Sequence, residues 1–131
     1  IIDFSKIQEE ALFNFKGGEG ELDTRNFIDS KNKVMMSRLK PGASSGEHTP
    51  NLEQNSEIVY IISGNGHFRY DDGVESFGPG SVHYCPMGHS HAMFNDGDAD
   101  VVYFAIVPGI IDGVILPRHW AVASPKWWCR L

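Results

Sequence analysis

The residues best suited to chemistry lie between positions 80 and 95, where the chain reads as a strand, a tight turn at Pro86 and a second strand. Alternate residues of a strand point to the same face of a sheet. His91, Met93 and Asn95 are therefore predicted to share one face, which in a barrel lines the interior. An imidazole at such a position is either a hydrogen-bonded core residue or a metal ligand.

The same stretch carries five residues at the spacing G-x5-P-x-G-x2-H-x3-N, and these are Gly80, Pro86, Gly88, His91 and Asn95. This is the full pattern of the second cupin motif. The chain resembles the cupin superfamily over residues 33 to 107. The resemblance implies a double-stranded β-helix, also called a jelly-roll barrel, which usually holds a metal ion.

The first cupin motif, G-x5-H-x-H-x3,4-E-x6-G, matches at both ends and differs in the middle. Gly42 is followed after five residues by His48, and Glu57 is followed after six by Gly64. Pro50 stands where the motif has its second histidine, and Glu57 comes nine positions after His48, which is longer than the motif allows. The resemblance therefore predicts an insertion in this loop and an altered set of metal ligands.

The ligand set that the resemblance implies is His48, Glu57 and His91, with Glu53 as a candidate fourth ligand. Glu53 lies four positions before Glu57, in the slot of the missing histidine, and is otherwise a solvated loop carboxylate. Two imidazoles and one carboxylate hold non-haem Fe(II) and leave coordination positions open. The same donors accept Mn, Ni, Cu or Zn, so the predicted cofactor is a divalent transition metal of unspecified identity.

Three further side chains near His91 could contribute to the chemistry. His89 lies two positions before His91, and together with Glu53 it could act as an acid or base. The alternative for His89 is an exposed turn residue. His83 and Cys85 share one face of a strand and line the pocket if that face is the interior. We expect that face instead to be the outside of the sandwich, where the two are packing residues, and no basic group that would activate Cys85 as a nucleophile is identifiable.

Short strands between turns must position these side chains, and they run from residue 24 to 107. About eight strands at this spacing are typical of a sandwich or barrel, so the predicted fold class is all-β. In the strand that begins at Glu57, the side chains of Val59 and Ile61 are predicted to face the same way as the carboxylate. With Met93 they would form an apolar pocket around a polar centre.

Two flanking segments differ from the barrel. A short helix is predicted over residues 5–12, with Ser5 as its cap and Gln8 at the capping-box position. The tail from 109 to 131 contains all three tryptophans, Trp120, Trp127 and Trp128. We expect one cupin domain over residues 1–131, with its barrel core at 24–107, and a homodimer in which the helix and the tail form the interface.

Composition excludes several classes of partner. The 131 residues suffice for one hydrophobic core, and their net charge is −6. No basic face is visible, which makes a nucleic-acid partner unexpected. No run of 18 apolar residues is present, so no membrane span is expected. The two cysteines, Cys85 and Cys129, do not form a disulfide framework, and without a visible signal peptide we expect reduced thiols and a cytoplasmic location.

These features predict a small metal-binding cupin with a small organic ligand in its barrel. As an enzyme it would be a metal-dependent dioxygenase, isomerase or lyase acting on an oxyanion or a polyol. One alternative is a metal-free sugar epimerase in which His48 and either Tyr60 or Tyr84 serve as base and acid. Another is a sugar-binding or other small-molecule-binding protein without turnover.

Overall fold

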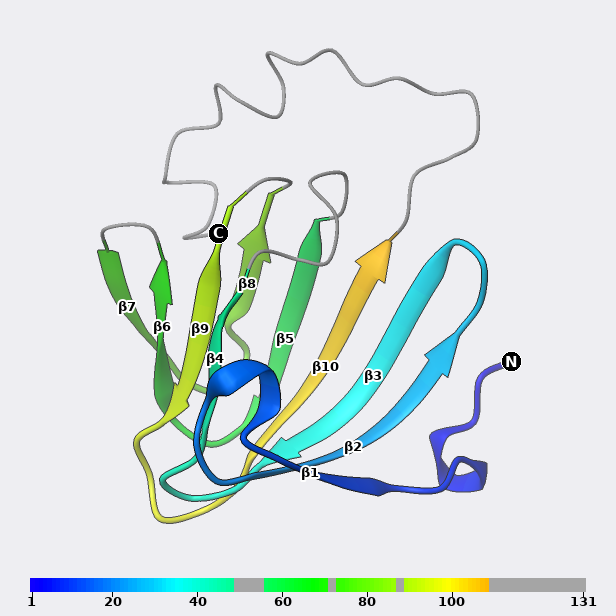
Figure 1. Ribbon diagram of the computed structural model, residues 1–131, viewed down its shortest axis with the longest axis horizontal. Coiled ribbons are helices and arrows are strands. Elements are labelled where there is room, and N and C mark those ends of the chain that lie inside the picture. The colour runs from blue at the N-terminus through cyan, green and yellow to red at the C-terminus, as the bar shows by residue number, and fades with distance from the viewer. Residues whose placement is uncertain (49–55, 71–72, 87–88, 109–131) are drawn as a thin grey trace, which may run out of the picture.

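The computed structural model describes residues 1–48, 56–70, 73–86 and 89–108. Within these ranges the chain forms ten strands and two short 3-10 turns (Figure 1). In chain order the elements are η1 (Phe4–Lys6), β1 (Glu10–Phe13), η2 (Phe15–Gly17), β2 (Glu21–Ile28), β3 (Asn32–Leu39), β4 (Ser44–His48), β5 (Glu57–Ser63), β6 (Gly66–Tyr70), β7 (Gly73–Phe77), β8 (Val82–Cys85), β9 (His91–Asn95) and β10 (Val101–Pro108). The predicted all-β class is confirmed.

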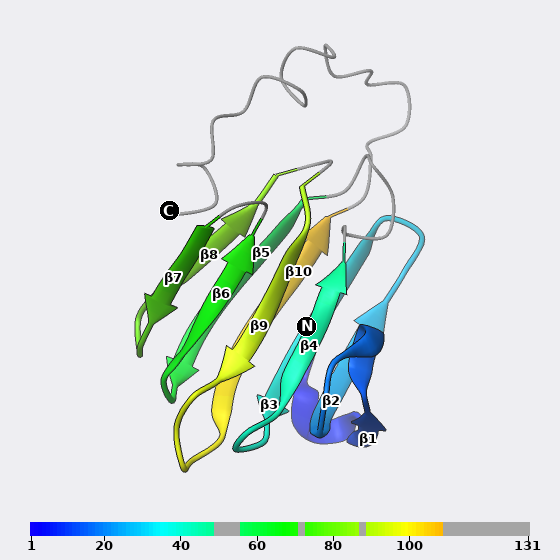
Figure 2. The same cartoon turned by 60° about the vertical axis from the view of Figure 1, so that its left-hand side comes forward.

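The strands form two antiparallel sheets that lie face to face (Figure 2). One sheet has six strands in the order β1-β2-β3-β10-β5-β8, and the other has four in the order β4-β9-β6-β7. Neighbours in each sheet are often distant in sequence, as β3 and β10 are, so the fold depends on long-range pairing. The apolar side chains between the two layers form the core, as expected of a jelly roll.

The central strands alternate strictly between core and surface. Along β5, Glu57, Val59 and Ile61 are buried, whereas Ile58 and Tyr60 are exposed. The neighbouring strand β10 continues the same pattern, with its own buried residues paired opposite those of β5. The predicted facing of the β5 side chains is therefore confirmed, and β5 presents a carboxylate on an otherwise apolar interior face.

The predicted helix over residues 5–12 is wrong. Only Phe4–Lys6 forms a 3-10 turn, and Glu10–Phe13 is an edge strand paired with β2. Arg25 fixes the turn by donating to the carbonyl oxygens of Phe4 and Ile7 at 3.0 and 2.7 Å. Pairing with the sheet satisfies the backbone of residues 10–13 and outweighs a weak local helix preference. Of the described residues, none belongs to a helix long and apolar enough to cross a membrane.

The tail from 109 to 131 lies outside the described residues, so its packing and its part in a homodimer stay predictions. The cytoplasmic location also stays a prediction. Several apolar side chains on the outer face of β5 and β8 are exposed, among them Ile58, Ile62 and Val82. These side chains lie on neighbouring strands, so they form one exposed apolar patch rather than isolated residues.

Asn95, at the end of β9, joins two backbone segments, the turn that follows it and the end of β3. Its side-chain amide donates to the carbonyl oxygens of Leu39 and Ala99, each at 2.9 Å, and its Oδ1 accepts from the amide of Gly97 at 2.9 Å. The residue is 5% exposed. A buried amide with these partners fixes the turn after β9 relative to the end of β3.

Asn95→Ala is expected to lower the free energy of unfolding by about 2–3 kcal/mol, because it leaves buried carbonyl groups without a donor. Chemical denaturation monitored by fluorescence measures the change. The matched control is Asn32→Ala at an exposed site, which should change stability by less than about 0.5 kcal/mol. Equal effects of the two substitutions would contradict this role for Asn95.

Candidate metal centre

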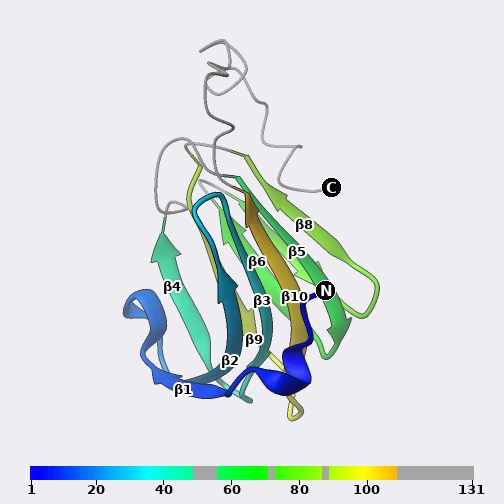
Figure 3. The same cartoon turned by 90° about the vertical axis from the view of Figure 1, so that its right-hand side faces the viewer.

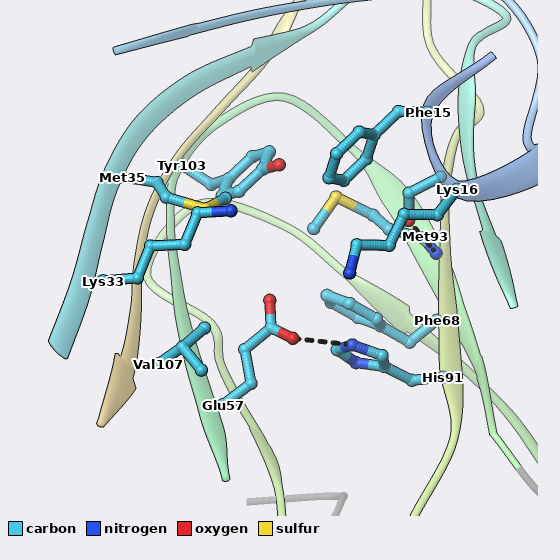
Figure 4. A pocket seen from close by; sticks show the side chains of 11 residues that line it. Phe15, Lys16, Lys33, Met35, Glu57, Phe68, His91, Met93, Tyr103 and Val107 are labelled. Carbon is cyan, nitrogen blue, oxygen red and sulfur yellow. Dashed lines mark hydrogen bonds and ion pairs between the residues drawn. The ribbon is translucent and has the colours of Figure 1, made fainter. Parts of the chain in front are cut away.

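Glu57 and His91 meet between the two sheets and form the polar centre of the interior. Each is the first residue of its strand, Glu57 of β5 and His91 of β9. Glu57 Oε2 lies 2.8 Å from His91 Nε2, and the two side chains are 12% and 3% exposed (Figure 4). A carboxylate buried to this degree requires a charged or hydrogen-bonding partner. The pair therefore supplies two of the predicted ligand residues at one point.

The pair opens onto a pocket with apolar walls. Among the residues that line it are Phe15, Met35, Phe68, Met93 and Val107. The polar side chains of the lining include Lys16 from η2, Lys33 from β3 and Tyr103 from β10 (Figure 4). The predicted contribution of Met93 is confirmed, whereas Val59 and Ile61 belong to the packed core. An apolar pocket with a few converging polar groups is the usual form of a small-molecule site.

Tyr103 presents a protonated hydroxyl to this part of the interior. Its side chain is buried, and burial together with the nearby Glu57 carboxylate raises the pKa of the phenol well above its usual value, although a hydrogen bond with Ser37 opposes the shift. Tyr103 is consequently a hydrogen-bond donor rather than a base. The pKa of Lys16 is lowered, mainly by burial and also by the like charge of Lys33, and the Glu57 carboxylate opposes this shift.

A second group of potential ligands lies behind the His91 ring. His83 Nε2 is 3.0 Å from His91 Nδ1, and the His83 ring stacks on Phe68 with centroids 3.7 Å apart. Cys85 is 0% exposed. One ligand atom from each of His83, Cys85 and His91 lies within 4.8 Å of the others, so these three buried residues could bind a metal ion.

His91 thus belongs to two donor sets through its two ring nitrogens. Nε2 faces Glu57 and the pocket, whereas Nδ1 faces His83. A neutral imidazole has one nitrogen free to bind a metal, so one ion at a time is expected on this ring. Both sides fit by distance, because two adjacent ligands at about 2.1 Å from a metal lie roughly 3 Å apart, but Glu57 and His91 are the pair that lines the pocket. If a metal binds Nε2 on the pocket side, the hydrogen bond with His83 at the other nitrogen, Nδ1, would orient the ring, as hydrogen-bond partners of metal-bound histidines do.

The other predicted site residues fall in different places. His48 ends β4, and its backbone pairs with that of His91. Glu53 lies outside the described residues. His89 lies between β8 and β9, with its amide donating to the Pro86 carbonyl at 3.3 Å, and it does not line the pocket around Glu57. The metal-binding role of His48 and the roles of Glu53 and His89 stay predictions.

The expected position of His83 and Cys85 on the outside of the sandwich is wrong, although Cys85 does pack in the core and neither residue lines the pocket around Glu57. Both lie on the interior face of β8, where Cys85 pairs with Glu57 and His83 with Val59. The spacing of the two residues placed them on one face, but the choice of face depends on the register between β5 and β8. That register joins segments more than twenty positions apart, and no local pattern specifies it.

Two tyrosines considered as acids lie on the opposite side of the sheet. Tyr60 is 45% exposed, and Tyr84 pairs with Ile58 on the same outer face. Neither lines the pocket around Glu57. The tyrosine that does is Tyr103, which the sequence interpretation did not single out. A polar residue in the apolar run of β10 was the available signal.

Residues 35–107 match the family model of the cupin domain, and the chain therefore belongs to the cupin family. An oxalate-binding protein of Thermotoga maritima is 31% identical to it over 114 residues, covering 82% of this chain and 92% of that protein.

Solved structures show the same architecture. The crystal structure of a predicted oxalate decarboxylase from Thermotoga maritima superposes with a TM-score of 0.76 at 27% identity, covering 84% of this chain and 99% of the other. A sugar phosphate isomerase of the cupin superfamily from Silicibacter pomeroyi superposes with a TM-score of 0.66 at 19% identity, covering 84% and 76%. The second likeness shows the fold alone.

The raised pKa of Tyr103 gives a testable pH dependence. Since the folded protein holds this proton more tightly than the unfolded chain, the stabilisation is complete below about pH 10 and is lost as pH rises towards the higher folded value. The parent should lose stability above about pH 10 more steeply than Tyr103→Phe. The tyrosinate absorbance gained near that pH should be equal in the two proteins. A smaller gain in the variant would mean that Tyr103 ionises normally.

Proposed function

We propose that this cupin binds one divalent transition metal through His91, Glu57 and His48, and uses it to bind a small organic carboxylate such as oxalate. The observation that carries the proposal is the charge of the pocket. Two ammonium groups, those of Lys16 and Lys33, stand on either side of the space in front of the Glu57–His91 pair (Figure 4). A carboxylate ligand complements a metal centre flanked by cations.

The donor set supports this metal position. Glu57 and His91 supply a carboxylate oxygen and an imidazole nitrogen 2.8 Å apart, on the side of His91 that opens to the pocket. His48 is the third ligand in the proposal, because its backbone is paired with His91. When bound, the metal would act as a Lewis acid towards the carboxylate. Fe, Mn, Ni, Cu and Zn all suit two imidazoles and one carboxylate.

The chain's own residues would bind and orient the ligand. Tyr103 is placed to donate a hydrogen bond, since its raised pKa keeps the phenol protonated. The apolar wall excludes water, which strengthens each electrostatic interaction inside the pocket. The likeness to an oxalate-binding protein across most of both chains supports oxalate as the first ligand to test.

The metal-free epimerase is disfavoured by the position of the tyrosines. Its proposed acid, Tyr60 or Tyr84, lies on the outer face of the sheet, and the tyrosine at the pocket keeps its proton. A lyase reaction on oxalate remains within the proposal as a turnover that the same bound ligand could undergo.

Metal analysis tests the ligand set. Protein purified without chelator and exposed to Mn(II), Fe(II), Ni(II), Cu(II) or Zn(II) should retain about one ion per chain of at least one metal, and His91→Ala should retain less than ~0.1. Cys85→Ser should retain the parent's content, because Cys85 lies on the other side of the His91 ring. Thermal unfolding checks that both variants fold.

Cobalt(II) distinguishes the two donor sets independently. A thiolate ligand gives an intense sulfur-to-cobalt charge-transfer band, which nitrogen and oxygen ligands do not give. The Co(II)-loaded parent should lack this band. Its presence in the parent and loss in Cys85→Ser would place the ion with His83 and Cys85 instead.

Calorimetry tests the ligand. The metal-loaded protein should bind oxalate with a dissociation constant below ~1 mM, and the metal-free protein should not bind it at that concentration. Lys33→Met should weaken binding, whereas Lys31→Gln, which removes an exposed charge, should not. Assays for carbon dioxide and formate on the same samples separate a lyase from a binding protein. Absence of binding to every metal-loaded form would contradict the proposed ligand.

A further inference from the structure

The η2 turn brings Phe15 and Lys16 to the pocket in an unfavourable backbone conformation. Lys16 has φ 52° and ψ 35°, and the preceding Asn14 has φ 53° and ψ 44°. Among the described residues these two are the non-glycine residues with positive φ. Such conformations are costly for residues with a Cβ and persist where the surrounding structure imposes them. Figure 3 shows the turn, in blue, beside β4.

Close packing on β4 imposes this conformation. A Cβ added to Gly46 would overlap the carbonyl oxygen of Lys16, and one added to Gly18 would overlap the carbonyl oxygen of Ser44. The amide of Ser44 donates to the Glu19 carbonyl at 2.8 Å, and the Glu19 amide donates to Ser44 Oγ at 3.1 Å. The backbone of η2 is therefore fixed against β4 at a separation that only glycine allows.

Packing of the side chains continues the same arrangement into the pocket. The ring of Phe15 packs against the core cluster, and Lys16 Nζ lies 5.6 Å from the centre of that ring. This distance allows a favourable cation–π contact. From the opposite side, β3 contributes Lys33 to the lining of the same pocket (Figure 4). The two ammonium groups come from separate elements, and a strained turn fixes one of them.

Two cations converge on a site with one carboxylate, that of Glu57, among the described residues that line it. Each ammonium group repels the other, and Lys33 lowers the pKa of Lys16 in addition to its burial. A bound monocarboxylate brings one negative charge, and in the proposed site this carboxylate would bind the metal ion. A second carboxylate on the same small ligand brings a further negative charge, and its oxygens can accept hydrogen bonds from the two ammonium groups.

We propose that Lys16, held by η2 and assisted by Lys33, recognises the second carboxylate of a small dicarboxylate, so that η2 makes the site selective for dianions over monoanions. This inference rests on the proposed binding of a carboxylate at the metal and adds the class of carboxylate. Lys16 acts as a specificity residue that contacts the ligand. The turn acts as its support.

The test compares four proteins loaded with the same metal: the parent, Lys16→Gln, Gly46→Ala and the control Lys31→Gln. Calorimetry measures oxalate and malonate as dianions, and acetate and glycolate as monoanions. Lys16→Gln should weaken dianion binding by at least about tenfold and change monoanion binding by less than about twofold. Gly46→Ala should act in the same direction without removing a charge, because its methyl group displaces η2.

Metal content and thermal unfolding are measured on all four proteins. If no carboxylate binds the parent, both the proposed function and this inference fail. Suppose that the parent binds oxalate, but Lys16→Gln weakens the binding of dianions and monoanions equally or leaves both unchanged. The inference alone is then overturned. An effect of Lys31→Gln as large as that of Lys16→Gln would show a general charge effect and also overturn it. Loss of metal in Lys16→Gln would assign Lys16 to the metal centre and overturn its role in specificity.

Discussion

The contact between Glu57 and His91 is the constraint on which the interior depends. It joins the two sheets at a point where both side chains are withdrawn from water, with 2.8 Å between the carboxylate oxygen and the ring nitrogen. A carboxylate in an apolar interior is unfavourable unless it is paired. The pair therefore fixes how the first residues of β5 and β9 approach each other, and with them the position of the pocket.

The His91 ring carries this constraint further through its second nitrogen. His83 occupies that side at 3.0 Å, and the stacked ring of Phe68 limits how His83 can turn. One histidine thus lies between a carboxylate that faces the pocket and an imidazole that faces the core. A metal ion on the pocket side would bind between His91 Nε2 and Glu57, and the contact with His83 on the other nitrogen would orient the ring for it.

The strained turn η2 is supported by the four-stranded sheet to which β9 and His91 belong. Strand β4 pairs with β9 through its backbone, and it also supports the backbone of η2, because Gly46 lacks a Cβ. The positive φ of Lys16 is maintained by this support. The chain accepts an unfavourable local conformation where it places a cation beside the Glu57–His91 pair, and strain of this kind is often found at functional sites.

The sequence by itself determined the fold class and both residues of the polar centre. Alternation along β5 predicted the buried faces of Glu57, Val59 and Ile61, and the spacing from residue 80 to 95 pointed to His91. These properties are local, because strand parity and turn geometry depend on residues close together in the chain. The same local reasoning predicted a helix at residues 5–12, where pairing with β2 formed a strand instead.

Only the tertiary structure decided which further side chains meet His91. The register between β5 and β8 turned His83 and Cys85 inward, and the packing of η2 on β4 brought Lys16 to the pocket. Each of these placements joins segments far apart in the sequence. A shift of one residue in a strand pair reverses the face of every side chain, and no short pattern of residues encodes that choice.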